Sequence, residues 1–75
     1  MFSARQQDAL RAIARLRERD GYSPTIRELG DELGVRSSNG VAQLLATLKR
    51  KGGVTWEPLR ARTLALTDVG RQAIA

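Results

Sequence analysis

Two short predicted helices with almost no chain between them constrain this sequence more than any other feature. Thr25 and Glu28 have the spacing of a capping box, which marks a helix start, and Gly34 is a residue type that ends helices. Three or four residues later, Ser37 and Ser38 are good N-cap residues for the next helix. Two helices joined this tightly, with a glycine in the turn, indicate a helix-turn-helix. The apolar residues that the first of these helices is expected to bury are Ile26, Leu29 and Leu33.

The second of these helices has two faces of different chemistry. At about 100° per residue, one face is apolar and predicted to be buried. Its members are Val41, Leu44, Leu45 and Leu48. The opposite face has no acid, and it comprises Asn39, Gln43, Ala46 and Arg50, with Ala42 and Thr47 at its edges. Amides and guanidinium groups can pair two-pronged with base edges, so this face is typical of a helix for the DNA major groove. A polar solvent face that lacks acids is the alternative.

The remaining elements complete a small fold. Ser3 and Gln6 form a second capping-box pair, and Asp20-Gly21 ends the helix that they begin. After Gly52-Gly53 the sequence alternates with period two in two stretches, which predicts a β-hairpin with an arginine-bearing loop. Such a hairpin after a helix-turn-helix is called a wing, although it could also serve only to cover the core. Its side chains expected to face the helices are Val54, Trp56, Leu64 and Leu66, whereas Thr55, Arg60, Arg62 and Thr63 are expected to face outward.

The predicted fold is mainly α with a small β-hairpin, in one domain spanning residues 1–75. The expected elements are helices at about 3–19, 25–33 and 38–51, a hairpin near 54–66, and a short final helix over 69–75 after the Thr67-Asp68 cap. The residues expected to be buried by the first helix are Ala9, Leu10, Ala12, Ile13 and Leu16, and those of the last are Val69, Ala73 and Ile74. This architecture is a winged helix-turn-helix, with a three-helix core, a two-stranded wing and a short C-terminal helix.

Charge and composition narrow the function. The net charge is +5, and it lies entirely in residues 36–75, because residues 1–35 carry equal numbers of basic and acidic side chains. A basic patch of this kind indicates a polyanionic partner. The chain has no cysteine or histidine, so we expect no metal, no cofactor and no enzymatic activity. No apolar run approaches the roughly 20 residues that cross a membrane, and a cytoplasmic location is expected.

Residues 3–66 resemble the N-terminal DNA-binding domain of the LexA repressor family. The matching stretches are SARQQ, GYSPTIRELGDELGVRSSN, LLATLKRKG and a basic hairpin that closes on RTLAL. The resemblance implies a winged helix-turn-helix whose third helix enters the major groove of operator DNA. In this sequence the base-reading positions that it implies are Ser37, Asn39, Gly40, Ala42 and Gln43. It does not extend to the family's self-cleaving peptidase domain, so we expect an isolated DNA-binding module or a small stand-alone relative.

The sequence therefore predicts a transcriptional repressor or regulator that binds double-stranded DNA, as one copy or as two copies on an inverted repeat. Asn39 and Gln43 are expected to contact bases. The residues expected to position the protein on the DNA backbone or in the minor groove are Thr25, Arg27, Arg36, Ser37, Ser38, Arg50, Lys51, Arg60 and Arg62. A protein-interaction module, using Leu44 or Leu59, is the alternative.

Overall fold

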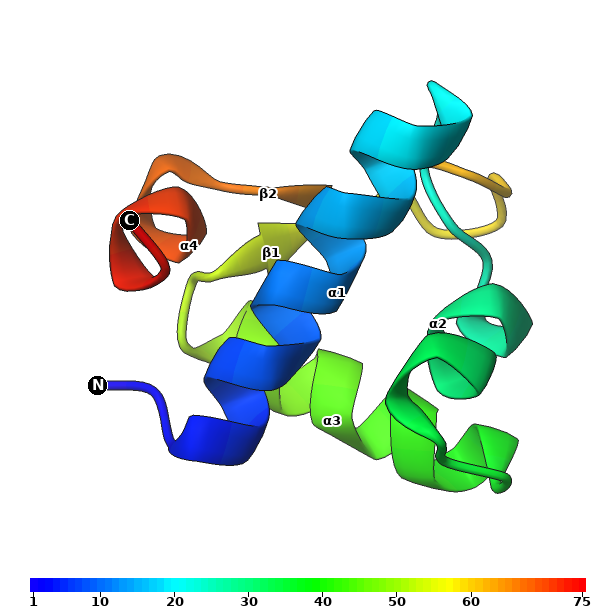
Figure 1. Cartoon of the computed structure of the whole chain (residues 1–75), viewed down its shortest axis with the longest axis horizontal. Helices are drawn as coiled ribbons and strands as arrows, with labels where there is room; N and C mark the ends of the chain where they lie inside the picture. Colours follow the sequence, from blue (N-terminus) through cyan, green and yellow to red (C-terminus); the bar gives the residue numbers. More distant parts are fainter.

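The computed structural model describes residues 1–75 and contains four helices and a two-stranded antiparallel sheet (Figure 1). The elements are α1 (Ala4–Asp20), α2 (Ile26–Leu33), α3 (Ser38–Arg50), β1 (Val54–Thr55), β2 (Ala65–Leu66) and α4 (Asp68–Ala73). Helix α1 crosses the front of the molecule, with α2 and the yellow loop of the hairpin on one side of it, the two strands and α4 on the other, and α3 below it (Figure 1). The predicted winged helix-turn-helix is confirmed. None of the helices combines the length and the apolarity needed to span a bilayer.

Local capping signals fix the helix ends. The Ser3 hydroxyl accepts a hydrogen bond from the Gln6 backbone N–H, and the Gln6 side chain accepts one from Ser3 in return. In all four helices the N-cap side chain accepts a backbone N–H, and the N-cap residues are Ser3, Thr25, Ser37 and Thr67; the reciprocal bond is present in α1 and α2. Gly21 and Gly34 end α1 and α2 in the left-handed conformation, with φ of 79° and 71°. The caps predicted from the sequence are therefore confirmed.

Eleven buried side chains form one hydrophobic core. Helix α1 supplies the largest share, as its stripe predicted, and α3 supplies the facing layer. The members of the core are Ala9, Leu10, Ala12, Ile13, Leu16, Leu29, Val41, Leu45, Leu48, Val54 and Leu64. Full burial of a leucine or isoleucine side chain contributes about 1.5–3 kcal/mol, so these contacts supply most of the driving force. Six predicted core residues are only half-buried at its edge, and they are Leu33, Leu44, Trp56, Leu66, Ala73 and Ile74.

Two residues predicted to be buried are exposed. Ile26 is 43% exposed, because it lies in the first turn of α2, beyond the point where Leu29 meets the core, and it lines an open groove instead. Val69 is 51% exposed, because the buried side of α4 is centred on Gly70 rather than on Val69. In α2 the core does not reach the first turn, whereas in α4 the first turn is buried at Gly70 and the prediction placed the buried face one residue too early.

The hairpin is shorter than the alternation predicted. Only Val54 pairs with Leu66 and Thr55 with Ala65. The Thr63 hydroxyl accepts a hydrogen bond from the Glu57 N–H at 2.9 Å and lies 3.1 Å from the Arg60 carbonyl oxygen, so it closes the loop from within. Because Thr63 bonds to the loop, the second strand begins at Ala65 instead of at Thr63. We call residues 56–64 the wing loop.

Helix α4 packs against the backbone at the end of α3. A β-carbon placed on Gly70 would lie 2.1 Å from the Gly53 carbonyl oxygen, so no side chain fits there. The same carbonyl accepts a hydrogen bond from the Thr67 N–H at 3.1 Å. Gly53 therefore joins the end of α3 to the start of α4.

Gly70→Ala should destabilise the protein, although alanine is the better helix former at an open site. The new β-carbon cannot coexist with the Gly53 carbonyl without moving α4. We expect a lower midpoint in thermal unfolding, followed by circular dichroism. Gln72→Ala, on the exposed side of the same helix, is the matched control and should change the midpoint little. A midpoint raised by Gly70→Ala would contradict this packing.

Candidate nucleic-acid interface

The start of α3 is held open to solvent by its cap. Ser37 is extended, and its hydroxyl accepts a hydrogen bond from the Gly40 N–H at 3.2 Å. Ser37, Ser38 and Asn39 are exposed, and the first turn contains no acid. The positive end of the helix dipole and its free N–H groups therefore face outward without a competing carboxylate, an arrangement that favours an anion such as a phosphate.

The outward face of α3 has the composition that the sequence predicted. Asn39, Ala42, Gln43, Ala46 and Arg50 are all exposed. The buried stripe on the other side is Val41, Leu45 and Leu48. Small residues separate the two amides, so a flat partner could approach the helix closely. This is the side-chain pattern that can read base edges in a major groove.

Thr47 and Gly40 differ from the other predicted interface residues. Thr47 is half-buried, its hydroxyl donates to the Gln43 carbonyl oxygen at 3.0 Å, and it lies 3.5 Å from the Arg50 guanidinium. Gly40 is turned toward the α2–α3 turn, since a β-carbon there would meet Val35 at 3.4 Å. Both residues therefore contribute to the conformation of the helix, and neither is a fully exposed member of its outward face.

The angle between α2 and α3 depends on a glycine that sequence reasoning missed. Gly30 is buried, and a β-carbon there would lie 3.0 Å from the Val35 carbonyl oxygen and 3.2 Å from a Val41 methyl group. Its place in the middle of an eight-residue helix, where glycine is unfavourable, was the available signal. Gly30 lets the turn fold back onto α2 and so places the start of α3.

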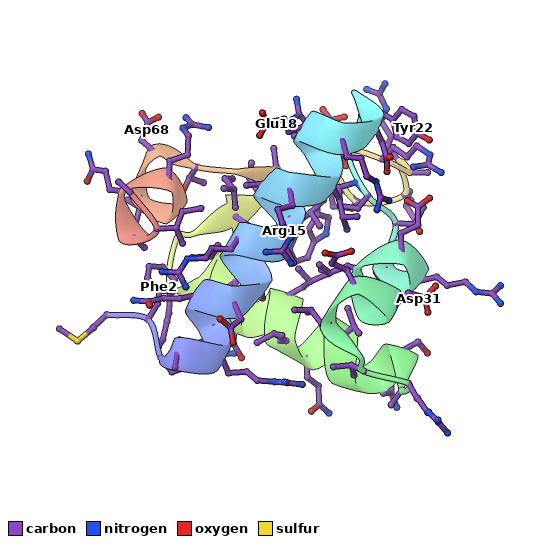
Figure 2. The ribbon with its side chains drawn as sticks, viewed as in Figure 1. Phe2, Arg15, Glu18, Tyr22, Asp31 and Asp68 are labelled. Carbon is purple, nitrogen blue, oxygen red and sulfur yellow. The ribbon has the colours of Figure 1, made fainter.

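Near α2, the residues predicted to contact the DNA backbone differ in whether they already bind another group of the protein. The Thr25 hydroxyl is occupied, because it caps α2 by accepting from the Glu28 N–H at 3.1 Å. Arg27 and Arg36 are exposed, and neither forms an ion pair. On the other side of α2, Arg15 of α1 reaches across to Glu32 at 2.9 Å (Figure 2).

The two lysines at the end of α3 bind within the protein. Lys51 donates to the Met1 carbonyl oxygen and to the Gln6 side chain, both at 2.8 Å. Lys49 lies over the Trp56 ring at 4.2 Å from its centroid. Lys51, predicted to contact the DNA backbone, is thus engaged in holding the N-terminus of the chain against the end of α3.

Arg60 and Arg62, two residues apart in the wing loop, have different partners. Arg60 pairs with Glu57 within the loop at 2.9 Å, and its side chain is 73% exposed. Arg62, predicted to face outward, folds back onto α2: it pairs with Glu28 at 3.1 Å and donates to the Ser23 carbonyl oxygen. Arg60 is therefore the more exposed of the two, and its ion pair stays within the wing loop.

A groove of about 260 Å³ lies between α3, the first turn of α2 and the wing loop. Ala42 and Leu45 of α3, Ile26 of α2 and Arg60 of the wing line it. The groove therefore connects the exposed face of α3 to the wing, so a long polyanion could contact both at once. No group of residues suited to hold a metal ion occurs in the structure.

The Glu28 carboxyl lies at the junction of these elements. The hydrogen bond from the Thr25 backbone N–H, and then the Arg62 guanidinium, hold the pKa of Glu28 below its ordinary value of 4.5. A carboxylate whose pKa is lowered by folding stabilises the protein above its unfolded pKa, and this contribution is lost as the pH falls through the folded pKa.

Glu28→Gln should therefore change how stability depends on acid pH. Glutamine keeps the capping-box acceptor but cannot carry the charge. We expect the difference in unfolding free energy between parent and variant to be constant above about pH 5 and to shrink below the ordinary Glu28 pKa of 4.5. Urea unfolding at a series of pH values measures this difference. Parallel curves for the two proteins down to acid pH would disagree with the assigned pKa shift.

Comparison with known proteins agrees with this geometry. The family model described as the LexA DNA binding domain matches residues 1–63. The LexA repressor of Anaeromyxobacter sp. (strain Fw109-5) is 47% identical over 70 residues, which cover 93% of this chain and 30% of the relative. The LexA repressor of Sorangium cellulosum (strain So ce56) is 43% identical over 68 residues, covering 91% of this chain and 30% of that protein.

A more distant relative gives the same result. The LexA repressor of Desulfitobacterium hafniense (strain Y51) is 37% identical over 72 residues, covering 96% of this chain and 35% of that protein. The chain thus spans about a third of the length of these relatives. Because the family match takes in both helices of the helix-turn-helix and most of the wing, the chain belongs to the LexA DNA-binding domain family.

Proposed function

We propose that this chain binds double-stranded DNA in a sequence-specific manner and represses transcription, with α3 in the major groove. The observation that carries the proposal is the exposed, acid-free face of α3, which presents two amides between small residues beside the capped helix start. The relatives named LexA repressor support the regulatory role. A DNA ligand also agrees with the cytoplasmic location expected from the sequence.

The contacts divide by chemistry. Asn39 and Gln43 read bases, because each amide can donate and accept and can pair with adenine N6 and N7. Ser37, Ser38, Arg27 and Arg36 position α3 on phosphates, and Arg50 and Arg60 extend the contact along the backbone. Phosphate contacts orient the protein, and base contacts supply the specificity.

Two copies would bind together on an inverted site. One small DNA-binding module buries only about 600–1,000 Å² of protein surface, and high affinity commonly needs a second module. Selection of binding sites from random duplex DNA tests this proposal, since paired inverted half-sites would be recovered if two copies act together. Recovery of single half-sites would restrict the proposal to a monomer, and failure to enrich any sequence would favour the protein-interaction alternative.

Asn39→Ala and Gln43→Ala should reduce specificity and leave stability intact. We expect each to cost about 1–3 kcal/mol on the selected site and little on a scrambled duplex of equal length. Fluorescence-anisotropy titration of both duplexes, together with thermal melts, measures both effects. Gln72→Ala removes an exposed amide from α4 and is the matched control. Equal losses on the two duplexes would show that the amides do not read bases.

Arg36→Ala should weaken binding to every sequence. If Arg36 neutralises one phosphate, its loss should make the slope of log affinity against log salt shallower by about 0.9. Arg71→Ala is the control, because Arg71 lies on α4 and pairs with Asp68. Titrations at four salt concentrations give both slopes. If the Arg36 variant had the same slope of log affinity against log salt as the parent protein, Arg36 would not contact a phosphate.

A further inference from the structure

Arg62 connects the wing to the helix-turn-helix through several contacts at once. Its guanidinium donates to the two carboxylate oxygens of Glu28 at 3.1 and 3.4 Å and to the Ser23 carbonyl oxygen at 3.1 Å. It also lies 4.5 Å from the centre of the Tyr22 ring. These partners are 34 to 40 residues away in sequence, and they belong to the link after α1 and the first turn of α2. Figure 2 shows Tyr22 at the end of the molecule where this link meets the wing loop.

The partner of Arg62 is itself fixed. Glu28 accepts the Thr25 backbone N–H at 2.9 Å, so its carboxylate is held by the start of α2 as well as by the wing. An arginine that pairs with a fixed carboxylate through two nitrogens has both its orientation and its distance from that carboxylate restricted. The loop is thereby tied to the same turn that sets the beginning of the helix-turn-helix.

The backbone of the wing loop turns sharply at two non-glycine residues. Leu59 and Arg62 have φ of 64° and 59°, a left-handed conformation that favours glycine or asparagine. The Leu59 side chain is fully exposed, so this conformation belongs to the loop itself. The case for Arg62 therefore rests on the contacts of its guanidinium with Glu28, Ser23 and Tyr22.

These contacts determine the width of the groove beside α3. The short strands hold the wing loop at one end, and Arg62 holds it at the other, next to Thr25 and Ile26. Arg60 lies between these two anchors and lines the same groove as Ala42 of α3. Without the second anchor, residues 57–61 would be held by the two-residue strands, by the buried Leu64 and by the hydrogen bonds of Thr63 within the loop, none of which reaches α2.

We propose that Arg62 is a positioning residue: with Glu28 and Tyr22 it forms a latch that holds the wing at a fixed distance from α3, and it acts on DNA through Arg60. The effect on DNA rests on the proposed function, whereas the latch itself does not. Both arginines of the loop are paired, but the Arg62 side chain is 41% exposed against 73% for Arg60, so Arg62 contributes less as a phosphate contact.

Lysine substitutions separate the latch from a phosphate contact. Arg62→Lys keeps the positive charge, which suffices for a phosphate, but loses the two-pronged pairing and the flat stacking surface. Arg60→Lys is the matched control in the same loop. Amide hydrogen exchange and ¹⁵N relaxation of residues 57–63 in the free protein should show a more mobile wing in Arg62→Lys and an unchanged wing in Arg60→Lys. An unchanged wing in both variants would overturn the latch, whether or not the protein binds DNA.

Titration against the selected duplex and a scrambled one tests the effect on DNA. An exposed ion pair and a cation–π contact are each modest, so Arg62→Lys should weaken binding about three- to tenfold at an unchanged salt slope. Arg60→Ala should make the slope shallower. Parent affinity in Arg62→Lys, combined with a shallower slope in Arg62→Ala, would make Arg62 a phosphate contact and overturn the proposal.

Glu28→Gln gives a test in which the two explanations predict opposite signs. Removing an acid from a DNA-binding protein tightens binding if only charge matters. The latch predicts weaker binding and a mobile wing, because glutamine preserves the helix cap but loses the ion pair with Arg62. Tighter binding by Glu28→Gln with a rigid wing would therefore refute the latch. If none of the proteins binds any duplex, the proposed function fails, and the relaxation data alone decide the latch.

Discussion

The close approach of Gly30 to the turn is the constraint on which the arrangement of the helix-turn-helix depends. The Val35 carbonyl and a Val41 methyl group occupy the space that a side chain at this position would need. Because the contact joins α2, the turn and the first buried residue of α3, it determines the direction in which α3 leaves the turn. The positions of the α3 amides and the width of the groove beside α3 depend on that direction.

Features that depend on neighbouring residues could be predicted from the sequence, and features that depend on distant ones could not. The four N-caps and the α1 stripe follow from side chains a few residues apart, and the structure confirms them. The prediction that Ile26 and Val69 are buried is wrong, because apolar spacing indicates which face of a helix a side chain occupies but not whether another element packs against that position. The predicted strands are too long because the alternation includes Thr63. In the structure the Thr63 hydroxyl bonds within the loop, and the strand pairing begins only at Ala65. The Glu28 partner of Arg62 lies 34 residues away, and no local pattern could indicate it.

The location of the net charge in residues 36–75 was informative, but much of that charge is used inside the fold. Lys51 holds the N-terminus, Lys49 covers Trp56, and Arg71 pairs with Asp68. Arg36 and Arg50, at the two ends of α3, form no ion pair. The electrostatic surface offered to a polyanion is therefore smaller than the formal charge suggests. Because Arg36 and Arg50 lie at the two ends of the helix that bears the exposed amides, they can orient a partner as well as attract it.

The position of Trp56 has a consequence for how the molecule can be observed. It is the only tryptophan in the chain, it is half-buried, and it lines the groove between α3 and the wing with Lys49 over its ring. Its fluorescence therefore arises from the groove alone, without a second emitter in the core. Excitation at the red edge of indole absorption would make the unlabelled protein an optical reporter of this groove, and quencher access to the ring would report how open the groove is.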